Sequence, residues 1–467
     1  MQDKTQQIFR DAPVPKAVLT NVIPSIISML MVLVYNLADT FFIGQTKDPL
    51  MVAAVSIATP AFIIFMAVGM LFGIGGTSMI SRMLGEGKRD MAKHISAFCF
   101  WTGAAIGVIA MIIMTIFSVP VCRLIGASDA TIGYASQYLS IVAIGIPFLI
   151  VSNSFSNIIR SEGHATVAMT GMIIGNMINI VLDPVMIIGF KWYVAGAAVA
   201  TVLGNIFSTV FYIIHLTSKR SILSIKPKDY SAKKIITLGV LSIGIPASLN
   251  SILMSFSNIM INSFMAKHGD LQLAGLGVAM KVNMIAVMLL IGVGTGIQPL
   301  LGYCFGAGNS KRYRSVLKFS LCFAICLSII MTLICYLGAA PLAKAFLDDE
   351  EAFGYAFAFS RIYIMSGPVL GILFVFINAI QSMGAAIPSL ILSVSRQGII
   401  YFPILITTSI VNNTPVNLAM TQPITDYIAT ALSIVLFIVA YKKYFVAKDD
   451  TSVADLSLIH ISEPTRH

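Results

Sequence analysis

Apolar residues fill most of the chain in long stretches that are separated by short polar segments. Twelve of these stretches reach the roughly 20 residues that an α-helix needs to cross the hydrocarbon core of a bilayer. They cover approximately 18–43, 51–80, 94–118, 133–157, 166–190, 193–217, 237–265, 272–301, 315–338, 353–379, 387–410 and 423–445. The pattern predicts an all-α polytopic membrane protein with 12 transmembrane helices. An even number of spans places both termini on the same side.

Composition agrees with this prediction. The 467 residues are 57% hydrophobic and 11% charged, whereas about a quarter of the residues in soluble domains are charged. The net charge of +10 comes from Lys and Arg that concentrate in the N-terminus, in alternate loops and near the C-terminus. Positive loops face the cytoplasm, so we expect cytoplasmic termini, contact with the lipid bilayer and no nucleic-acid partner.

The second half of the chain repeats the first. Matching pairs 221 positions apart include Pro147 and Pro368, Asn157 and Asn378, and Gly85-x-Gly87 and Gly306-x-Gly308. Because each repeat holds six spans, the halves share one orientation, and we expect two six-helix bundles related by a parallel pseudo-twofold axis. Such repeats are typical of secondary transporters, which move two lobes around a site near the bilayer midplane.

This repeat predicts the domain organisation. We expect a cytoplasmic N-terminus (1–16), an N-lobe (17–217), a cytoplasmic linker (218–236), a C-lobe (237–445) and a cytoplasmic tail (446–455). Residues Leu456 to Arg466 match the translation of a transposase-type sequencing adapter. We therefore expect 456–467 to be an artefact rather than natural sequence.

Ionisable residues within the spans are the candidates for function, because each costs roughly 2.5–3.5 kcal/mol at a helix centre. Asp39 lies in the first span, three residues after Asn36. Asp183 in the fifth span shares a helical face with Asn176 and Asn179. Two carboxylates with amide oxygens suit either a proton or Na⁺. The residues alone leave the choice between the two ions open.

The second lobe lacks this pair, since Asp39 and Asp183 correspond to Ile261 and Ile404. We therefore expect ion coupling only in the N-lobe. Lys281 and Arg396 could line a cavity, contact backbone carbonyls or extend to the interface. The repeated Asn157 and Asn378 are further cavity candidates. For Asp426 we expect a dipole-stabilising role at a helix N-terminus.

Several of these motifs together resemble the multidrug and toxic compound extrusion (MATE) family. They are Pro24, Tyr35 to Gly44 (YNLADTFFIG), Gly85-x-Gly87 and the run from Asn176 through Asn179 to Asp183-Pro184. The resemblance implies a monomeric exporter of amphipathic, often cationic drugs in exchange for H⁺ or Na⁺, in the plasma membrane of a prokaryote. It also implies a cation site at Asp39, Asn179, Asp183 and Thr201, with Asn36, Asn176 and Tyr138 nearby and a hinge at Pro24.

Two other classes remain as alternatives. A lipid-linked oligosaccharide flippase would share the two-lobe plan but would need several basic residues in its cavity. A membrane-embedded enzyme or receptor is less consistent with the chain, which has no soluble domain, no G-x-x-x-x-G-K-[ST] phosphate loop and no H-E-x-x-H motif. We expect no enzyme activity and no cofactor other than the coupling ion.

Overall fold

A computed structural model describes residues 7–45, 49–346 and 349–446, and these residues form helices and connecting turns without β-strands. The predictions for residues 1–6 and 447–467, which include the adapter-like segment, lie outside this range. The N-terminal half contains α2 (Val14–Gly44), α3 (Pro49–Gly85), α4 (Arg89–Ile116), α5 (Ser118–Ile125), α6 (Ile132–Ser161), α7 (Ala165–Asp183), η1 (Pro184–Gly189) and α8 (Tyr193–Thr217).

A short 3-10 turn, η2 (Pro227–Asp229), lies in the linker. The C-terminal half contains α9 (Lys234–Ala266), α10 (Asp270–Gly306), α11 (Ser310–Phe346), α12 (Glu350–Ile364), α13 (Gly367–Ser382), α14 (Ala386–Val394), η3 (Ser395–Ile399), α15 (Tyr401–Val411), α16 (Pro415–Tyr441) and η4 (Lys442–Val446). Below, the N-lobe means α2 to α8 and the C-lobe means α9 to η4.

The described helices confirm the twelve predicted spans. Eleven are long and apolar enough to cross a membrane, and the bent pair α12 and α13, which meet at 47°, makes the twelfth. The start of the last span differs by eight residues, because α16 begins at Pro415 rather than at 423. Pro is favoured at a first helical position, and the Thr414 side chain caps this end. Asp426 therefore lies well inside the helix, and the helix-terminal role expected for it is wrong.

Matching turns show that the two halves are structural repeats. Gly87 and Gly308 follow the second helix of each lobe with φ of 77° and 66°, a region that favours glycine. The turn bonds correspond as well: Lys88 N donates to Met83 O, and Asn309 N donates to Cys304 O. The parallel repeat predicted from the sequence is present in the fold.

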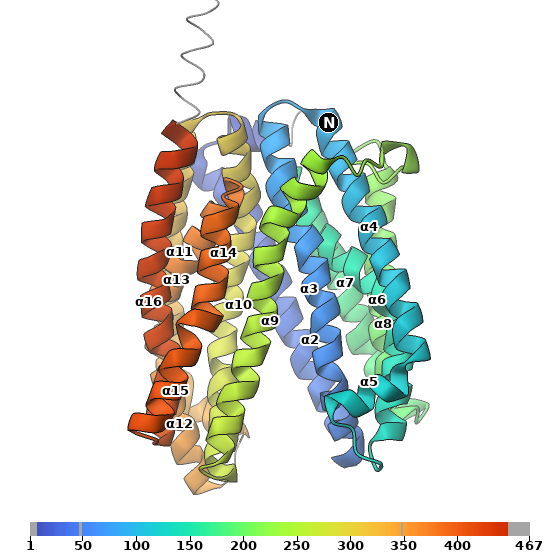
Figure 1. The fold of residues 1–467 in the computed structure, drawn as a ribbon, viewed down its shortest axis with the longest axis vertical. Helices are drawn as coiled ribbons and strands as arrows, with labels where there is room; N and C mark the ends of the chain where they lie inside the picture. The colour runs from blue at the N-terminus through green and yellow to red at the C-terminus, as the bar shows by residue number, and fades with distance from the viewer. Residues whose placement is uncertain (1–6, 46–48, 347–348, 447–467) are drawn as a thin grey trace, which may run out of the picture.

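The lobes are joined through their second helices. α3 packs against α9 of the C-lobe, and α10 packs against α2 of the N-lobe. Near the ends of α3 and α10 the backbones approach so closely that a Cβ at Gly85 would overlap Tyr303 O, and one at Gly306 would overlap Arg82 O. These contacts lie at the end of the molecule that holds the N-terminus and the end of α16, here called the terminal end. The two halves diverge toward the opposite end (Figure 1).

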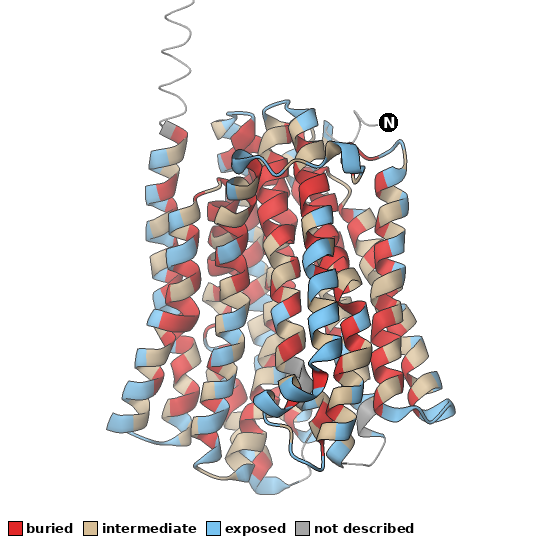
Figure 2. Cartoon of the chain, turned by 45° about the vertical axis from the view of Figure 1, so that its right-hand side comes forward, coloured by how far each residue is buried: buried red, intermediate tan, exposed pale blue. Residues whose placement is uncertain are grey.

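The outer surface suits lipid. On α4, Ile109 and Ile116 are 58% and 67% exposed, and the outer faces of other helices are exposed or partly exposed (Figure 2). An apolar outer face on helices whose backbone bonds are satisfied internally is what a bilayer requires. Polar side chains are instead buried inside both lobes.

Candidate ion and substrate site

A cavity of about 260 Å³ lies in the N-lobe among α2, α3, α6, α7 and α8, with Met288 from α10 at its edge. Its polar lining consists of Tyr35, Asn36, Ser152, Asn153, Ser156, Asn176, Asn179, Thr201, Asn205, Ser208 and Tyr212. Apolar residues that include Phe62, Met66 and Met172 complete the wall. No Lys, Arg or His contributes to this lining. The cavity therefore offers hydrogen bonds and apolar contact without positive charge.

Asp183 ends α7 beside this cavity. Its side chain is fully buried, and the π-helix η1 follows it directly, a distortion that is frequent at functional sites. With the amide nitrogen of Asn179 turned toward the carboxylate, that nitrogen donates to Asp183 Oδ2 at 3.0 Å. The Asn179 oxygen then accepts from the backbone N of Thr201 at 3.0 Å and from its Oγ1 at 3.2 Å. Asn179 thus links Asp183 to α8.

The other carboxylate oxygen, Asp183 Oδ1, is buried and has no hydrogen-bond partner among the described residues. Asp39 on α2 is partly buried and lies within electrostatic range of Asp183. The hydroxyls of Tyr35 and Tyr138 are within range of both carboxyl groups. Four helices, α2, α6, α7 and α8, therefore bring the predicted acidic pair together with Asn179, Thr201 and Tyr138.

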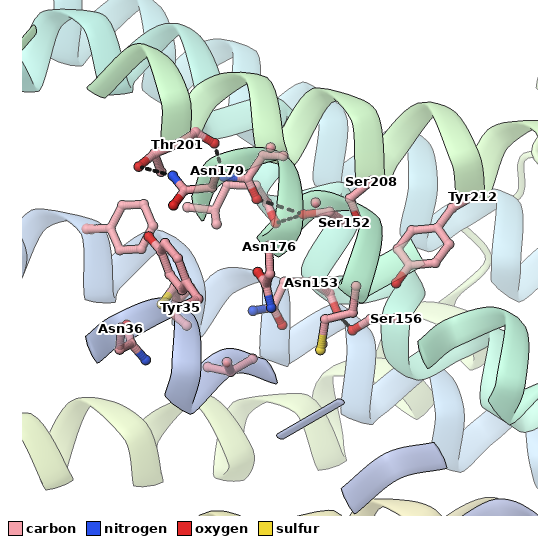
Figure 3. Close-up of a pocket in the computed structure, with 18 of the residues that line it drawn as sticks. Tyr35, Asn36, Ser152, Asn153, Ser156, Asn176, Asn179, Thr201, Ser208 and Tyr212 are labelled. Carbon is pink, nitrogen blue, oxygen red and sulfur yellow. Dashed lines mark hydrogen bonds between the residues drawn. The ribbon is translucent and has the colours of Figure 1, made fainter. Parts of the chain in front are cut away.

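Asn36 and Asn176, also predicted at this site, line the cavity. Figure 3 shows Asn176 and Asn179 on one face of α7, with Thr201 and Tyr35 on the neighbouring helices. The buried Nδ2 of Asn176 has no hydrogen-bond partner among the described residues, so it can donate to a molecule in the cavity. Pro24, the predicted hinge, is buried within α2, about three turns before Asn36.

The four further cavity candidates lie elsewhere. Asn157 and Asn378 pack at equivalent positions, where a Cβ on Gly73 or Gly294 would meet their side-chain nitrogens. Lys281 is exposed on α10. None of these residues, nor Arg396, lines the cavity described above.

Arg396 forms a buried ion pair that sequence reasoning missed. Its Nη2 lies 3.0 Å from Asp426 Oδ1, and the two side chains are 6% and 1% exposed. Gln422 Nε2 lies 3.2 Å from both Asp426 oxygens. The pair connects η3 to α16. No signal in the sequence joins two residues that lie 30 positions apart on different helices.

Asn205 was also missed. Its Nδ2 donates to Thr201 O at 2.9 Å, and its Oδ1 accepts from Ser152 Oγ at 3.2 Å. The sequence could have identified this residue, because Asn205 is four residues after the predicted site residue Thr201 and so lies on the same helical face.

Twelve spans in two repeated lobes, with a polar cavity and a pair of carboxyl groups in one of them, define a secondary-transporter architecture. Comparison with known proteins agrees. The MatE family model matches residues 24–185 and 246–407, and these ranges are the two repeats. The chain belongs to the MatE family, the multidrug and toxic compound extrusion transporters.

Individual relatives cover most of the chain. Multidrug export protein MepA of Staphylococcus aureus strain NCTC 8325 is 30% identical over 410 residues, which are 87% of this chain and 89% of that protein. MepA of Staphylococcus saprophyticus is also 30% identical, over 411 residues, with the same coverage. A structure described as the outward-facing conformation of a multidrug resistance MATE family transporter matches with a TM-score of 0.88 at 24% identity, over 95% of this chain and 98% of that one.

Proposed function

We propose that the protein exports amphipathic, often cationic compounds in exchange for H⁺ or Na⁺, and that the ion binds at Asp39 and Asp183. The observation that carries this proposal is the buried Asp183 carboxylate, which has one oxygen bound by Asn179 and the other without a protein partner. An unpaired carboxylate oxygen away from water is costly, and either a proton or a cation would remove that cost.

The donor set fits both ions. Carboxylate and hydroxyl oxygens at Asp183 and Thr201 are hard ligands that Na⁺ takes, and Asn179 would add its amide oxygen if the amide turned over on ion binding. A neighbouring carboxylate at Asp39 also favours the uptake of a proton, because two like charges that are close together disfavour full ionisation. We therefore keep both ions as substrates of the exchange.

The cavity lining supports an amphipathic substrate. Phe62, Met66 and Met172 offer adaptable apolar contact, while Asn176 and neighbouring groups offer hydrogen bonds. A flippase for a pyrophosphate-linked lipid would need basic groups to bind the phosphates. The lining contains none, and Arg396 is paired with Asp426. The MepA relatives are named multidrug export proteins, which also favours drug export.

Ion and drug would compete through the conformation of the lobes. A bound ion has to favour one lobe arrangement to drive transport, and α2 carries both Asp39 and the break in helical bonding at Pro24. The contacts of Gly85 and Gly306 close the terminal end of the molecule. With that end in the cytoplasm of a bacterium, as the Lys and Arg distribution favours, this arrangement is the one that faces outward.

The test is efflux of a cationic dye such as ethidium from proteoliposomes that contain the purified protein. H⁺ and Na⁺ gradients are imposed separately, and empty liposomes serve as the control. We expect at least one gradient to accelerate efflux about tenfold or more. Efflux that is the same with and without both gradients would exclude ion exchange, and absence of dye movement under every condition would argue for another substrate class.

A further inference from the structure

Three potential metal ligands meet at the terminal end of the N-lobe, outside the cavity lining. Glu162 follows α6, His164 precedes α7, and His215 lies in the last turn of α8. Their side chains are 0%, 20% and 10% exposed, and one ligand atom from each lies within 4.8 Å of the others. Neither the cavity nor the carboxylate pair uses these residues.

The two distances to Glu162 match those of a tetrahedral metal site. His164 Nδ1 lies 3.3 Å from Glu162 Oε1, and His215 Nε2 lies 3.2 Å from the same oxygen. Around a zinc ion with bonds of about 2.0–2.1 Å, neighbouring tetrahedral ligands lie about 3.3 Å apart. We propose a binding site for Zn²⁺, or for a divalent transition metal with a similar preference for nitrogen and oxygen ligands, formed by Glu162, His164 and His215.

The chemistry of the cluster supports this assignment. Two imidazoles and one carboxylate are a known zinc ligand set. Glu162 adds a carboxylate whose negative charge would favour a cation, and its side chain is fully buried within reach of both imidazoles. The partial exposure of the His164 side chain gives a metal ion access to the cluster.

Groups in the linker orient the carboxylate. The backbone N of Ile222 donates to Glu162 Oε2 at 2.8 Å, and Ser221 Oγ lies 3.0 Å from both carboxylate oxygens. Such outer contacts fix a ligand in position and are a regular part of metal sites. In this protein they also join the site to the segment that leads into α9, the first helix of the C-lobe.

A bound metal would therefore fasten the linker to the N-lobe. The linker already contacts α4, where His94 Nδ1 is 2.7 Å from Asp229 O and Trp101 Nε1 donates to Ile225 O at 3.0 Å. The metal would add a bond network from α6, α7 and α8 to Ser221 and Ile222. We expect the bound metal to stabilise the fold. This proposal does not depend on the proposed ion exchange.

The experiment measures metal binding directly. The full chain, with His460 and His467 replaced by Asn and no affinity-tag histidines, is treated with EDTA and titrated with Zn²⁺ in detergent. Bound zinc is counted by elemental analysis, and Co²⁺ in place of Zn²⁺ reports tetrahedral geometry through its visible absorption. We expect about one metal per chain and a rise in the unfolding temperature with zinc.

Variants identify the ligands. His164→Asn and His215→Asn should each weaken zinc binding more than the roughly 10–100-fold that loss of an outer-shell partner costs. The matched control is His268→Asn, because His268 lies in the turn between α9 and α10, where it contacts Asn413. The proposal is overturned if the parent chain binds no zinc in the micromolar range. It is also overturned if both single variants, shown to be folded by their unfolding transitions, bind zinc as tightly as the parent.

Discussion

The two carboxylate oxygens of Asp183 have different surroundings. Oδ2 accepts a hydrogen bond from Asn179, whereas Oδ1 is buried without a hydrogen-bond partner among the described residues. A carboxylate in this setting is fixed in orientation and still able to bind an ion. Asn179 sets that orientation, because its amide also contacts Thr201 on the neighbouring helix.

Replacing Asn179 should therefore change ion coupling. A hydrogen bond to a charged group contributes about 1.5–3 kcal/mol, so Asn179→Leu should shift the ion concentration for half-maximal efflux by about tenfold or more. The measurement is dye efflux across a range of pH and Na⁺ concentrations. Thr170→Val is the control, because Thr170 is also on α7 and its exposed hydroxyl donates to the carbonyl of Thr166 in the same helix. An unchanged ion dependence in Asn179→Leu would show that Asn179 does not position the carboxylate.

The residues of the acidic pair and Asn179 could be chosen from the sequence, whereas contacts between separate helices could not. Asp39 and Asp183 stand out because charge in an apolar span is rare, and Asn179 is found by helical spacing from Asp183. The pairing of Arg396 with Asp426 and the meeting of Glu162 with His215 could not be predicted. Both depend on how separate helices pack, and one sequence without its fold does not specify that.

Among the elements, η3 shows how a polar group is accommodated inside the C-lobe. This π-helical turn carries Arg396 to Asp426 on α16, and Ser257 Oγ of α9 donates to Gln397 O in the same turn at 2.8 Å. Arg396 also lies over the ring of Phe374, 5.2 Å from its centroid. Three helices are thereby fixed to one short irregular segment.

Removing one member of the buried pair should be costly. Arg396→Met leaves the Asp426 charge buried beside Gln422 alone, and breaking such a pair costs about 3–5 kcal/mol. The double variant Arg396→Met with Asp426→Leu should recover most of that loss, since apolar replacements of both partners are often neutral. Thermal unfolding in detergent measures the difference. Equal unfolding temperatures for the single and double variants would mean that the Asp426 charge is not destabilising when Arg396 is absent, and would contradict this prediction.

The close approach of α3 and α10 is a second feature at the element scale. A Cβ at Gly85 would overlap the carbonyl of Tyr303, so Gly85→Val should force the terminal ends of the lobes apart and stop dye efflux. A cysteine placed at Ser78, which donates to Gln381 O across the interface, should then react faster with a maleimide. Gly133→Val is the control, since a Cβ there meets nothing within 4 Å. Unaltered labelling and efflux in Gly85→Val would contradict a role for this contact.

At the scale of the whole molecule, the two lobes share a fold but differ in chemistry. Their turns at Gly87 and Gly308 are equivalent, yet the positions of the N-lobe carboxylates are taken by Ile261 and Ile404 in the C-lobe. The number of spans and the repeat could be predicted because they follow from the length of the apolar stretches and from residue matches at a fixed spacing along the chain. How the lobes interlock, with α3 on α9 and α10 on α2, appears only in three dimensions.

The central claim is that the Asp39 and Asp183 pair couples an ion gradient to export. The most direct measurement is gradient-driven dye efflux by Asp39→Asn and Asp183→Asn in proteoliposomes, with Asp129→Asn as the control, since its side chain is fully exposed. We predict that Asp39→Asn and Asp183→Asn each fold and lose gradient-driven efflux by about tenfold or more, while the control does not. Gradient-driven efflux at the parent rate in both variants would contradict it.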